Sequence, residues 1–271
     1  MTEYEIKPKR NFSFGFAELW AYRELFYFFV WRDIKVKYKQ TYLGVAWAIL
    51  QPFTMMLIFT FIGYIMKIPS EGLPYPVYFY SGMMLWTIFA SGLSQSGDSM
   101  ITNSSIIKKI YFPRLIIPMS AVLVSVFDFL MTFSLYIGLL IYFHIAPNIS
   151  IVLYLPAALC ITIISCFGLG CFLSALNVKY RDFRYVLPFL IQSMFFLSGV
   201  FVPMKIASHK WVEYVLAINP MNGAIQLFRS CITNAEVDFS LVGISAASAV
   251  LLLLIGLSYF RKTESYFADL A

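Results

Sequence analysis

Few side chains in this sequence of 271 residues could carry out covalent chemistry. The two histidines, His144 and His209, are too far apart for the H-E-x-x-H zinc motif, and the four cysteines include no C-x-x-C pair. The glycine patterns of a serine-hydrolase elbow and of a nucleotide-binding P-loop are also absent from the sequence. We therefore expect no catalytic residue, no metal and no cofactor held by this chain. If the protein moves something uphill, the energy must come from another chain or from an ion gradient.

Asp128 is an acidic residue inside a long apolar stretch. An ionisable group within a membrane span is a functional hypothesis by default, here as part of an ion-coupled pathway. The competing interpretation is that Asp128 pairs with a polar neighbour at a helix interface or lines a wet cavity. A single carboxylate without a basic partner in the spans gives only weak support for a proton relay.

The segment 98–114 combines helix-capping residues, two lysines and apolar side chains. Asn103 or Ser104 can begin a helix, and Pro113 can end it. We expect a helix of about nine residues that forms a compact knob, which can enter a groove on a partner protein. The alternative is a basic loop anchored by lipid phosphates. The candidate contact residues are Asn103, Ser104, Ile107, Lys108, Lys109, Tyr111, Phe112 and Arg114.

Residues 14–31 mix large aromatic side chains with charges, a composition typical of a helix that lies in the membrane interface. The alternative is an amphipathic helix packed on a soluble partner. Charged residues continue beyond residue 31. The candidate residues of this region are Trp20, Trp31, Arg32, Asp33, Lys35 and Lys37.

Residues 203–239 are too long for a simple connection, and their apolar residues recur at helical spacing. Asn219 followed by Pro220 is typical of a helix start, so we expect two short helices. They could cap a pathway, or they could only pack over the ends of membrane helices. The candidate residues are Trp211, Asn219, Pro220 and Met221.

Aromatic residues make up 18% of the chain. Most must face lipid or fill helix packing, although aromatic faces also bind the C–H faces of sugars and would suit a sliding polymer. The positions that could line a conduit are Phe53, Phe59, Tyr80, Trp86, Phe195 and Phe196, together with Asp128.

The composition indicates that the helices carrying these residues lie in a membrane. Apolar residues make up 60% of the chain and charged residues only 13%, about half the share in a soluble domain. Uncharged runs long enough to cross a bilayer, together with a turn signal at residues 144–148, give six spans in one domain of residues 1–271. We expect an all-α polytopic membrane protein with spans at about 45–66, 77–97, 115–143, 149–176, 185–202 and 240–260.

The basic residues predict the orientation of these spans. With residues 1–44 inside, the inner segments hold 16 of the 20 Lys and Arg residues and the outer segments hold 4. This positive-inside bias places both termini in the cytoplasm. The basic excess then faces anionic lipid or a cytosolic partner rather than nucleic acid.

Four segments, in this order, resemble a known family, the ABC-2 type permeases that export polysaccharides such as O-antigen, capsule and teichoic acid. The first runs from Trp31 to Gly44 (WRDIKVKYKQTYLG) and continues to Trp47 and the pair Gln51-Pro52. The others are KKIYFPR from Lys108 to Arg114 with Pro118, NVKYRDF at 177–183, and INPM at 218–221. The resemblance covers essentially the whole chain.

The resemblance implies a homodimeric membrane channel in the bacterial cytoplasmic (inner) membrane, served by two separate ABC ATPase subunits that bind ATP and Mg²⁺. It implies that 103–112 is the coupling helix, 14–31 the interface helix and 203–236 a pair of gate helices. The expected substrate is a glycan on undecaprenyl diphosphate, with basic residues of the first inner segment near the diphosphate. An ABC-2 exporter of a small molecule or lipid is the alternative. A membrane-embedded lipid-modifying enzyme would need clustered carboxylates or histidines.

Overall fold

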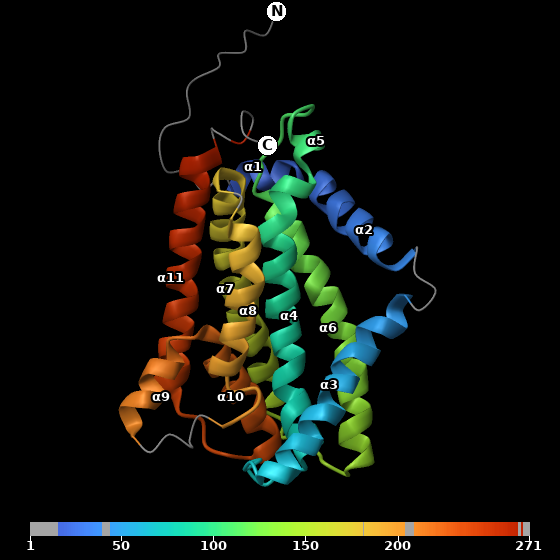
Figure 1. Cartoon of the computed structure of the whole chain (residues 1–271), viewed down its shortest axis with the longest axis vertical. Coiled ribbons are helices and arrows are strands. Elements are labelled where there is room, and N and C mark those ends of the chain that lie inside the picture. Colours follow the sequence, from blue (N-terminus) through green and yellow to red (C-terminus); the bar gives the residue numbers. More distant parts are fainter. Residues whose placement is uncertain (1–15, 40–43, 181, 204–208, 265–266, 268–271) are drawn as a thin grey trace, which may run out of the picture.

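The computed structural model describes residues 16–39, 44–180, 182–203, 209–264 and 267. The described part of the chain is helical and contains no strand, which confirms the all-α prediction. Long helices lie side by side, and short helices cover both ends of the bundle (Figure 1). The helices are α1 Phe16–Ala21, α2 Arg23–Lys39, α3 Gly44–Met66, α4 Tyr75–Thr102, α5 Ser104–Ile107, α6 Ile116–Tyr142, α7 Ile151–Lys179, α8 Phe183–Leu197, α9 Lys210–Ala217, α10 Pro220–Thr233 and α11 Phe239–Thr263.

Four described helices have the length and apolar composition of membrane spans: α3 over Ala46–Met66, α6, α7 and α11. At about 1.5 Å per residue, each is at least as long as the roughly 30 Å hydrocarbon core of a bilayer. The chain is therefore a multi-pass membrane protein. The other two predicted spans correspond to α4 and α8, which differ from these four helices in composition and in length.

α4 is long but less apolar because protein surrounds it. It has 28 residues, among them several Ser and Gly, and most of its side chains are buried between α6, α7 and α10. A helix enclosed by other helices does not need an apolar surface for lipid, and small residues allow close approach. α8 has only 15 residues and ends at Leu197, whereas the sequence predicts a span that reaches residue 202. At about 1.5 Å per residue, α8 is roughly 22 Å long.

Glycines allow a close helix crossing between α7 and α11. A Cβ added to Gly256 would lie 1.9 Å from the carbonyl oxygen of Gly168, and one added to Gly168 would lie 2.5 Å from the backbone nitrogen of Leu253. No other residue type fits at these two positions without moving a helix. The crossing fixes α11 against the core of the bundle.

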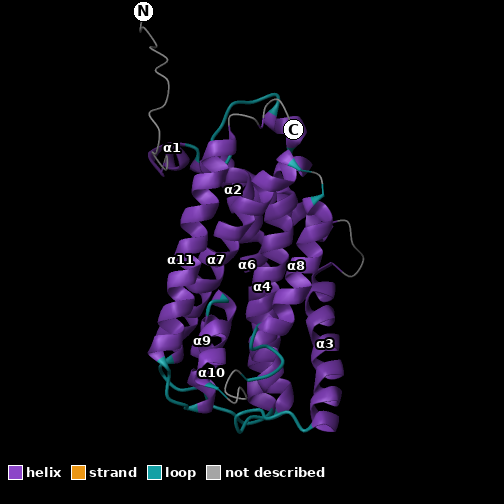
Figure 2. Ribbon diagram, turned by 60° about the vertical axis from the view of Figure 1, so that its left-hand side comes forward, coloured by secondary structure: helices purple, strands orange, loops and turns teal. Residues whose placement is uncertain are grey.

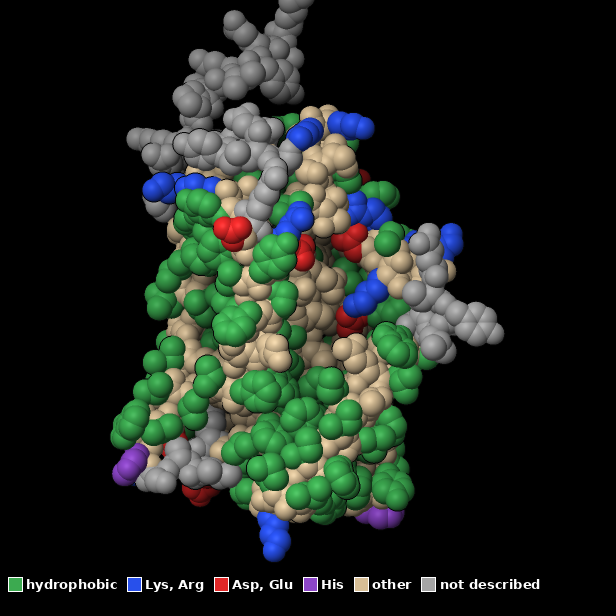
Figure 3. All heavy atoms as spheres, in the orientation of Figure 1, with side chains coloured by type: hydrophobic (Ala, Val, Ile, Leu, Met, Phe, Trp, Pro, Cys, Tyr) green, Lys and Arg blue, Asp and Glu red, His purple; other side chains and the backbone are tan. Residues whose placement is uncertain are grey.

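The two ends of the bundle differ in charge. α1, α2, α5 and the last turn of α11 lie at one end, and α9 and α10 lie at the other (Figures 1 and 2). Lys and Arg side chains gather at the α1, α2 and α5 end, whereas hydrophobic side chains cover the middle of the bundle on the face shown in Figure 3. The first and last described helices thus begin and end at the same, cationic end.

α3 lies at the edge of the bundle, where it packs against α4 and α6 (Figure 2). Most of its side chains are exposed, including Phe61, Tyr64 and Ile65. Such an apolar surface requires lipid or another protein chain to cover it.

Candidate functional site

The predicted knob between α4 and α6 is shorter than the sequence indicates. The helix α5 has four residues, Ser104–Ile107, rather than about nine, and the chain continues from it as a turn. Asn103 is at the N-cap position but makes no cap hydrogen bond. Its Nδ2 instead donates to the carbonyl oxygen of Ser99 at 2.9 Å, and this hydrogen bond connects the turn to α4. The helix prediction was correct in place and wrong in length.

Two of the predicted contact residues face the inside of the protein. Ile107 and Phe112 are 5% and 4% exposed and belong to an apolar cluster that includes Phe29 of α2, Met100 of α4 and Phe260 of α11. The prediction that they meet a partner is wrong for this chain, because the turn folds both side chains back onto the bundle. We call Ile107 and Phe112 the foot of the segment.

The outward side of this segment is made of four consecutive residues, Lys108 to Tyr111. All four are exposed, with Ile110 60% and Tyr111 75% exposed. We call these four residues the tip. Sequence reasoning missed Ile110. The tip combines two positive charges with two large apolar side chains.

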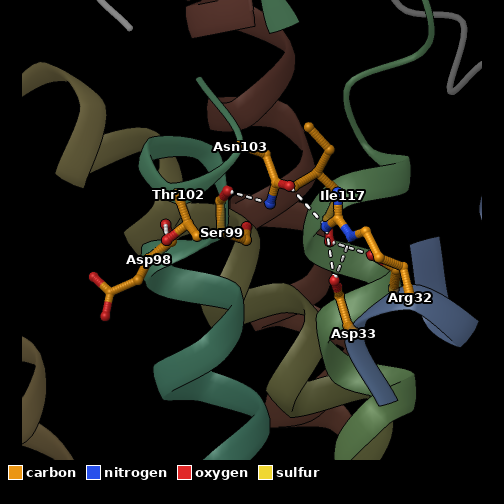
Figure 4. A network of polar contacts seen from close by, with 8 residues as sticks. Arg32, Asp33, Asp98, Ser99, Thr102, Asn103 and Ile117 are labelled. Atoms are coloured by element: carbon orange, nitrogen blue, oxygen red, sulfur yellow. Dashed lines mark hydrogen bonds and ion pairs between the residues drawn. The ribbon is translucent and has the colours of Figure 1, made fainter. Parts of the chain in front are cut away.

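Arg32 of α2 holds the start of α5 (Figure 4). Its Nη2 donates to Oδ1 of Asn103 at 2.8 Å, and its Nε donates to Oδ1 of Asp33 at 2.8 Å. The guanidinium lies 4.6 Å from the ring centroid of Phe29, which packs 5.7 Å from the ring of Phe112. Of the predicted charged residues, Arg32 therefore connects α2 directly to the segment between α4 and α6, and Asp33 pairs with Arg32.

Arg114 anchors the other end of the segment. Its Nη1 donates to the carbonyl oxygen of Glu264 at the end of α11, and its guanidinium lies 5.8 Å from the ring of Phe267. Ser104, between the two anchors, is half-buried. The segment is thus fixed at both ends, and its exposed residues are Ser105 and the four residues of the tip.

Asp128 has a basic partner that the sequence did not predict. It lies in α6, its side chain is 13% exposed, and it accepts hydrogen bonds from Nζ of Lys37 and from the hydroxyl of Tyr38, both on α2. Burial, and then the hydrogen bond and charge of Asp128, raise the pKa of Tyr38 above its usual range, so the hydroxyl stays protonated and donates. The structure supports the pairing interpretation of this carboxylate.

The outer faces of α1 and α2 carry the remaining predicted residues of this region. Trp31 is exposed, and Nζ of Lys35 lies 5.0 Å from its ring. Trp20, on α1, is 72% exposed. Residues 14–15 of the predicted interface helix and residues 40–43 of the following motif lie outside the described residues, as does Arg181. A shallow groove on this face is lined by Phe28, Trp31, Arg32, Lys35, Val36 and Lys39.

At the opposite end, α9 is on the surface and α10 is inside the bundle. Trp211 of α9 is 65% exposed, whereas Pro220 and Met221 at the start of α10 are buried. Asn219 caps α10 as the sequence predicts, since its Oδ1 accepts from the backbone nitrogen of Met221 at 3.1 Å. Residues 204–208 of the predicted gate lie outside the described residues. Of the two predicted gate helices, only α9 has a free outer face.

Arg229 of α10 is a buried residue that sequence reasoning missed. It donates five hydrogen bonds, to the side chains of Tyr78 and Ser81 and to the carbonyl oxygens of Tyr78, Gly199 and Val200. A Cβ added to Gly82 would lie 2.7 Å from its Nη2, so the glycine leaves room for the guanidinium. The signal in the sequence was a lone arginine in an otherwise uncharged helix. Arg229 joins α10 to α4 and to the turn after α8.

Most of the predicted conduit residues lie in the core of the chain. Tyr80 is fully buried and donates to the carbonyl oxygen of Thr132 at 3.1 Å, and Trp86 is 4% exposed. Phe53 and Phe59 of α3 and Phe195 of α8 are half-buried and pack against the same core. For Tyr80 and Trp86 the conduit prediction is wrong, because the sequence did not show which face of α4 meets α6 and α8. Phe196 remains exposed, at 65%.

Comparison with known proteins gives the family. The sequence profile of the ABC-2 type transporter family matches residues 24–233, which is most of the chain and includes α2, α5 and α10. The chain belongs to this family. As a member of this family the chain is a subunit of a transport system.

Several curated relatives match this ABC-2 chain over nearly their whole length. An O-antigen export system permease protein of Klebsiella pneumoniae is 29% identical over 240 residues, which are 88% of this chain and 92% of the relative. An O-antigen export system permease protein of Myxococcus xanthus is 25% identical, with 93% and 97% covered. A polysialic acid transport protein of Escherichia coli is 25% identical, with 86% and 91% covered.

Proposed function

We propose that this chain is the permease subunit of an ATP-driven exporter that moves a lipid-linked polysaccharide, O-antigen in the first place, across the bacterial cytoplasmic membrane. The observation that carries the proposal is the similarity, over nearly the full length, to relatives named as O-antigen and polysialic acid transporters. Because these relatives are named as transporters of polysaccharides, the similarity favours a polymer exporter over a small-molecule exporter with the same fold.

In the proposed topology α4 and α8 cross the membrane with α3, α6, α7 and α11, and both termini are cytoplasmic. The cationic end with α1, α2 and α5 is then the cytoplasmic end, as the positive-inside rule requires. The enclosed position of α4 supports its assignment as a span, and the turn at residues 198–203 extends the short α8 toward the far side.

Two copies of the chain would form the conduit. One face of α8 carries exposed side chains at helical spacing, Tyr185, Phe189, Gln192 and Phe196. A stripe of aromatic rings with one amide suits the alternating C–H and hydroxyl faces of sugars. We assign this stripe, rather than Tyr80 and Trp86, to the wall of the conduit.

The tip would be the contact to the partner ATPase subunits, which hold ATP and Mg²⁺. Ile110 and Tyr111 supply apolar area, and Lys108 and Lys109 supply charge, on a support that is fixed at both ends. Cations on the outer face of α2, among them Lys35 and Lys39, would meet the undecaprenyl diphosphate of the glycan carrier.

Deletion of the gene, followed by analysis of surface and cytoplasmic glycan, tests the proposal. We expect loss of the surface polymer and accumulation of the lipid-linked glycan inside the cell, with both reversed by the wild-type chain. An unchanged surface coat would reject polysaccharide export. Loss of an exported lipid or small molecule with a normal glycan coat would favour the alternative exporter.

A further inference from the structure

The helix α2 is joined to the bundle by polar contacts near its middle and at its end. Near its middle, Arg32 donates to Asn103 at the start of α5, and Phe29 packs on Phe112. At its end, Lys37 and Tyr38 donate to Asp128 of α6. The helix is continuous between these points. A continuous helix keeps its length under load, so the two attachment points are mechanically connected.

Asp128 lies far from the cytoplasmic end of α6. It is 12 positions after the first residue of the helix, Ile116, which corresponds to about 18 Å along the axis. A carboxylate at this depth is costly without partners, and the structure provides two donors for it. Both donors come from α2, so this contact is made between helices that are 90 residues apart in sequence.

The contact is also close to the first predicted span. α3 begins at Gly44, six residues after Tyr38, and most of its side chains are exposed. A change in the position of the end of α2 therefore changes where α3 begins. The contact at Asp128 determines the position of the C-terminal end of α2 on α6.

We propose that α2 is a strut, and that Lys37, Tyr38 and Asp128 form the joint through which movement of the α5 segment reaches α6 and the start of α3. This inference rests on the proposed function, because it takes the tip as the point where the ATPase acts. Lys37, Tyr38 and Asp128 are positioning residues in this scheme. The charge pair couples ATP hydrolysis in the partner to the membrane helices.

The test uses the complex that copurifies with the tagged chain, together with cells that lack the chromosomal copy. The variants are Asp128→Asn, Lys37→Asp, and the exchange Lys37→Asp with Asp128→Lys. The control is Glu24→Gln, which removes one negative charge from an exposed position of α2. Surface glycan, ATP turnover and the amount of chain in the membrane are measured for each.

We expect Asp128→Asn and Lys37→Asp to lower glycan exported per ATP hydrolysed by roughly fivefold or more, at a normal membrane level. The exchanged pair should restore at least half of the ratio, and Glu24→Gln should match the wild type. Normal coupling in both single variants would overturn the proposal. So would parallel loss of ATP turnover, export and membrane level, since that pattern indicates a structural role only.

A distance measurement keeps the proposal testable even if the chain does not export glycan. Spin labels are placed at Val36 of α2 and Ser134 of α6, both exposed, in a chain with Cys160 replaced by Ser. We expect Asp128→Asn to broaden the distance distribution and the exchanged pair to narrow it again. An unchanged distribution would show that the contact does not position α2. Failure of the wild-type chain to restore surface glycan would instead reject the proposed function.

Discussion

Arg229 shows how one residue can hold several segments together. Its five donors meet neutral oxygens of α4 and of the turn after α8, and its guanidinium lies 3.7 Å from the ring centroid of Tyr78. A buried charge is stable only if its hydrogen-bonding capacity is used, and here all five N–H groups are used. The geometry matters as much as the charge.

Replacement of Arg229 by Lys tests this point, because lysine keeps the charge but has three donors in place of five. We expect the free energy of unfolding to fall by about 2–3 kcal/mol, since buried carbonyl groups lose their partners. Thermal unfolding in detergent measures the change. Lys210→Gln, at the exposed start of α9, is the control with no expected change. Equal melting temperatures for Arg229→Lys and wild type would contradict the interpretation.

The segment between α4 and α6 separates into a buried foot and an exposed tip, and variants can distinguish them. Ile110→Asp with Tyr111→Ala should leave the melting temperature unchanged and abolish ATP-dependent export, because these side chains contact no core. Ile107→Asp should lower the free energy of unfolding by about 3 kcal/mol or more, because it buries a charge. Melting curves and export assays check both. A melting temperature lowered by the tip variant would show that the tip supports the fold.

The crossing of α7 and α11 is the second feature at the scale of helices. Gly256→Ala should destabilise the protein, because its Cβ would overlap the carbonyl oxygen of Gly168. Gly243→Ala, on the same helix but with nothing within 4 Å of the added Cβ, should be neutral or stabilising by up to about 1 kcal/mol. Unfolding of the two variants under the same conditions is compared. Equal effects would mean that the crossing tolerates separation of the helices.

The positions of most long helices could be predicted from the sequence, but which face of each helix is buried could not. Uncharged runs and the turn at residues 144–148 predict where long helices start and stop, since hydrocarbon excludes charge. They contain no information about which side of α4 is enclosed, so Tyr80 was assigned to a conduit. The sequence predicts no basic partner for Asp128 because the predicted spans contain none. Lys37 lies outside those spans, and its pairing with Asp128 depends on how α2 packs against α6.

At the scale of the molecule, the orientation in the membrane is the decisive test of the proposed topology. Reporter fusions after residue 105 and after residue 180 should report a cytoplasmic position, and a fusion after residue 146 should report the external side. The physical reason is the concentration of Lys and Arg at the α5 end of the bundle. A fusion after residue 105 that is active only outside the cell would reverse the topology and exclude contact between the tip and a cytosolic ATPase.

The position of Arg229 in the chain has a consequence for biogenesis. Every group that accepts from it belongs to residues 78, 81, 199 or 200, all of which precede it in the sequence. The ribosome therefore synthesises all of these acceptor groups before it synthesises Arg229. Folding of this end of the protein can follow the order of synthesis, because α10 packs against acceptor groups that are already present. A circular permutation that placed α10 before α4 would leave the guanidinium without these acceptors until α4 is synthesised.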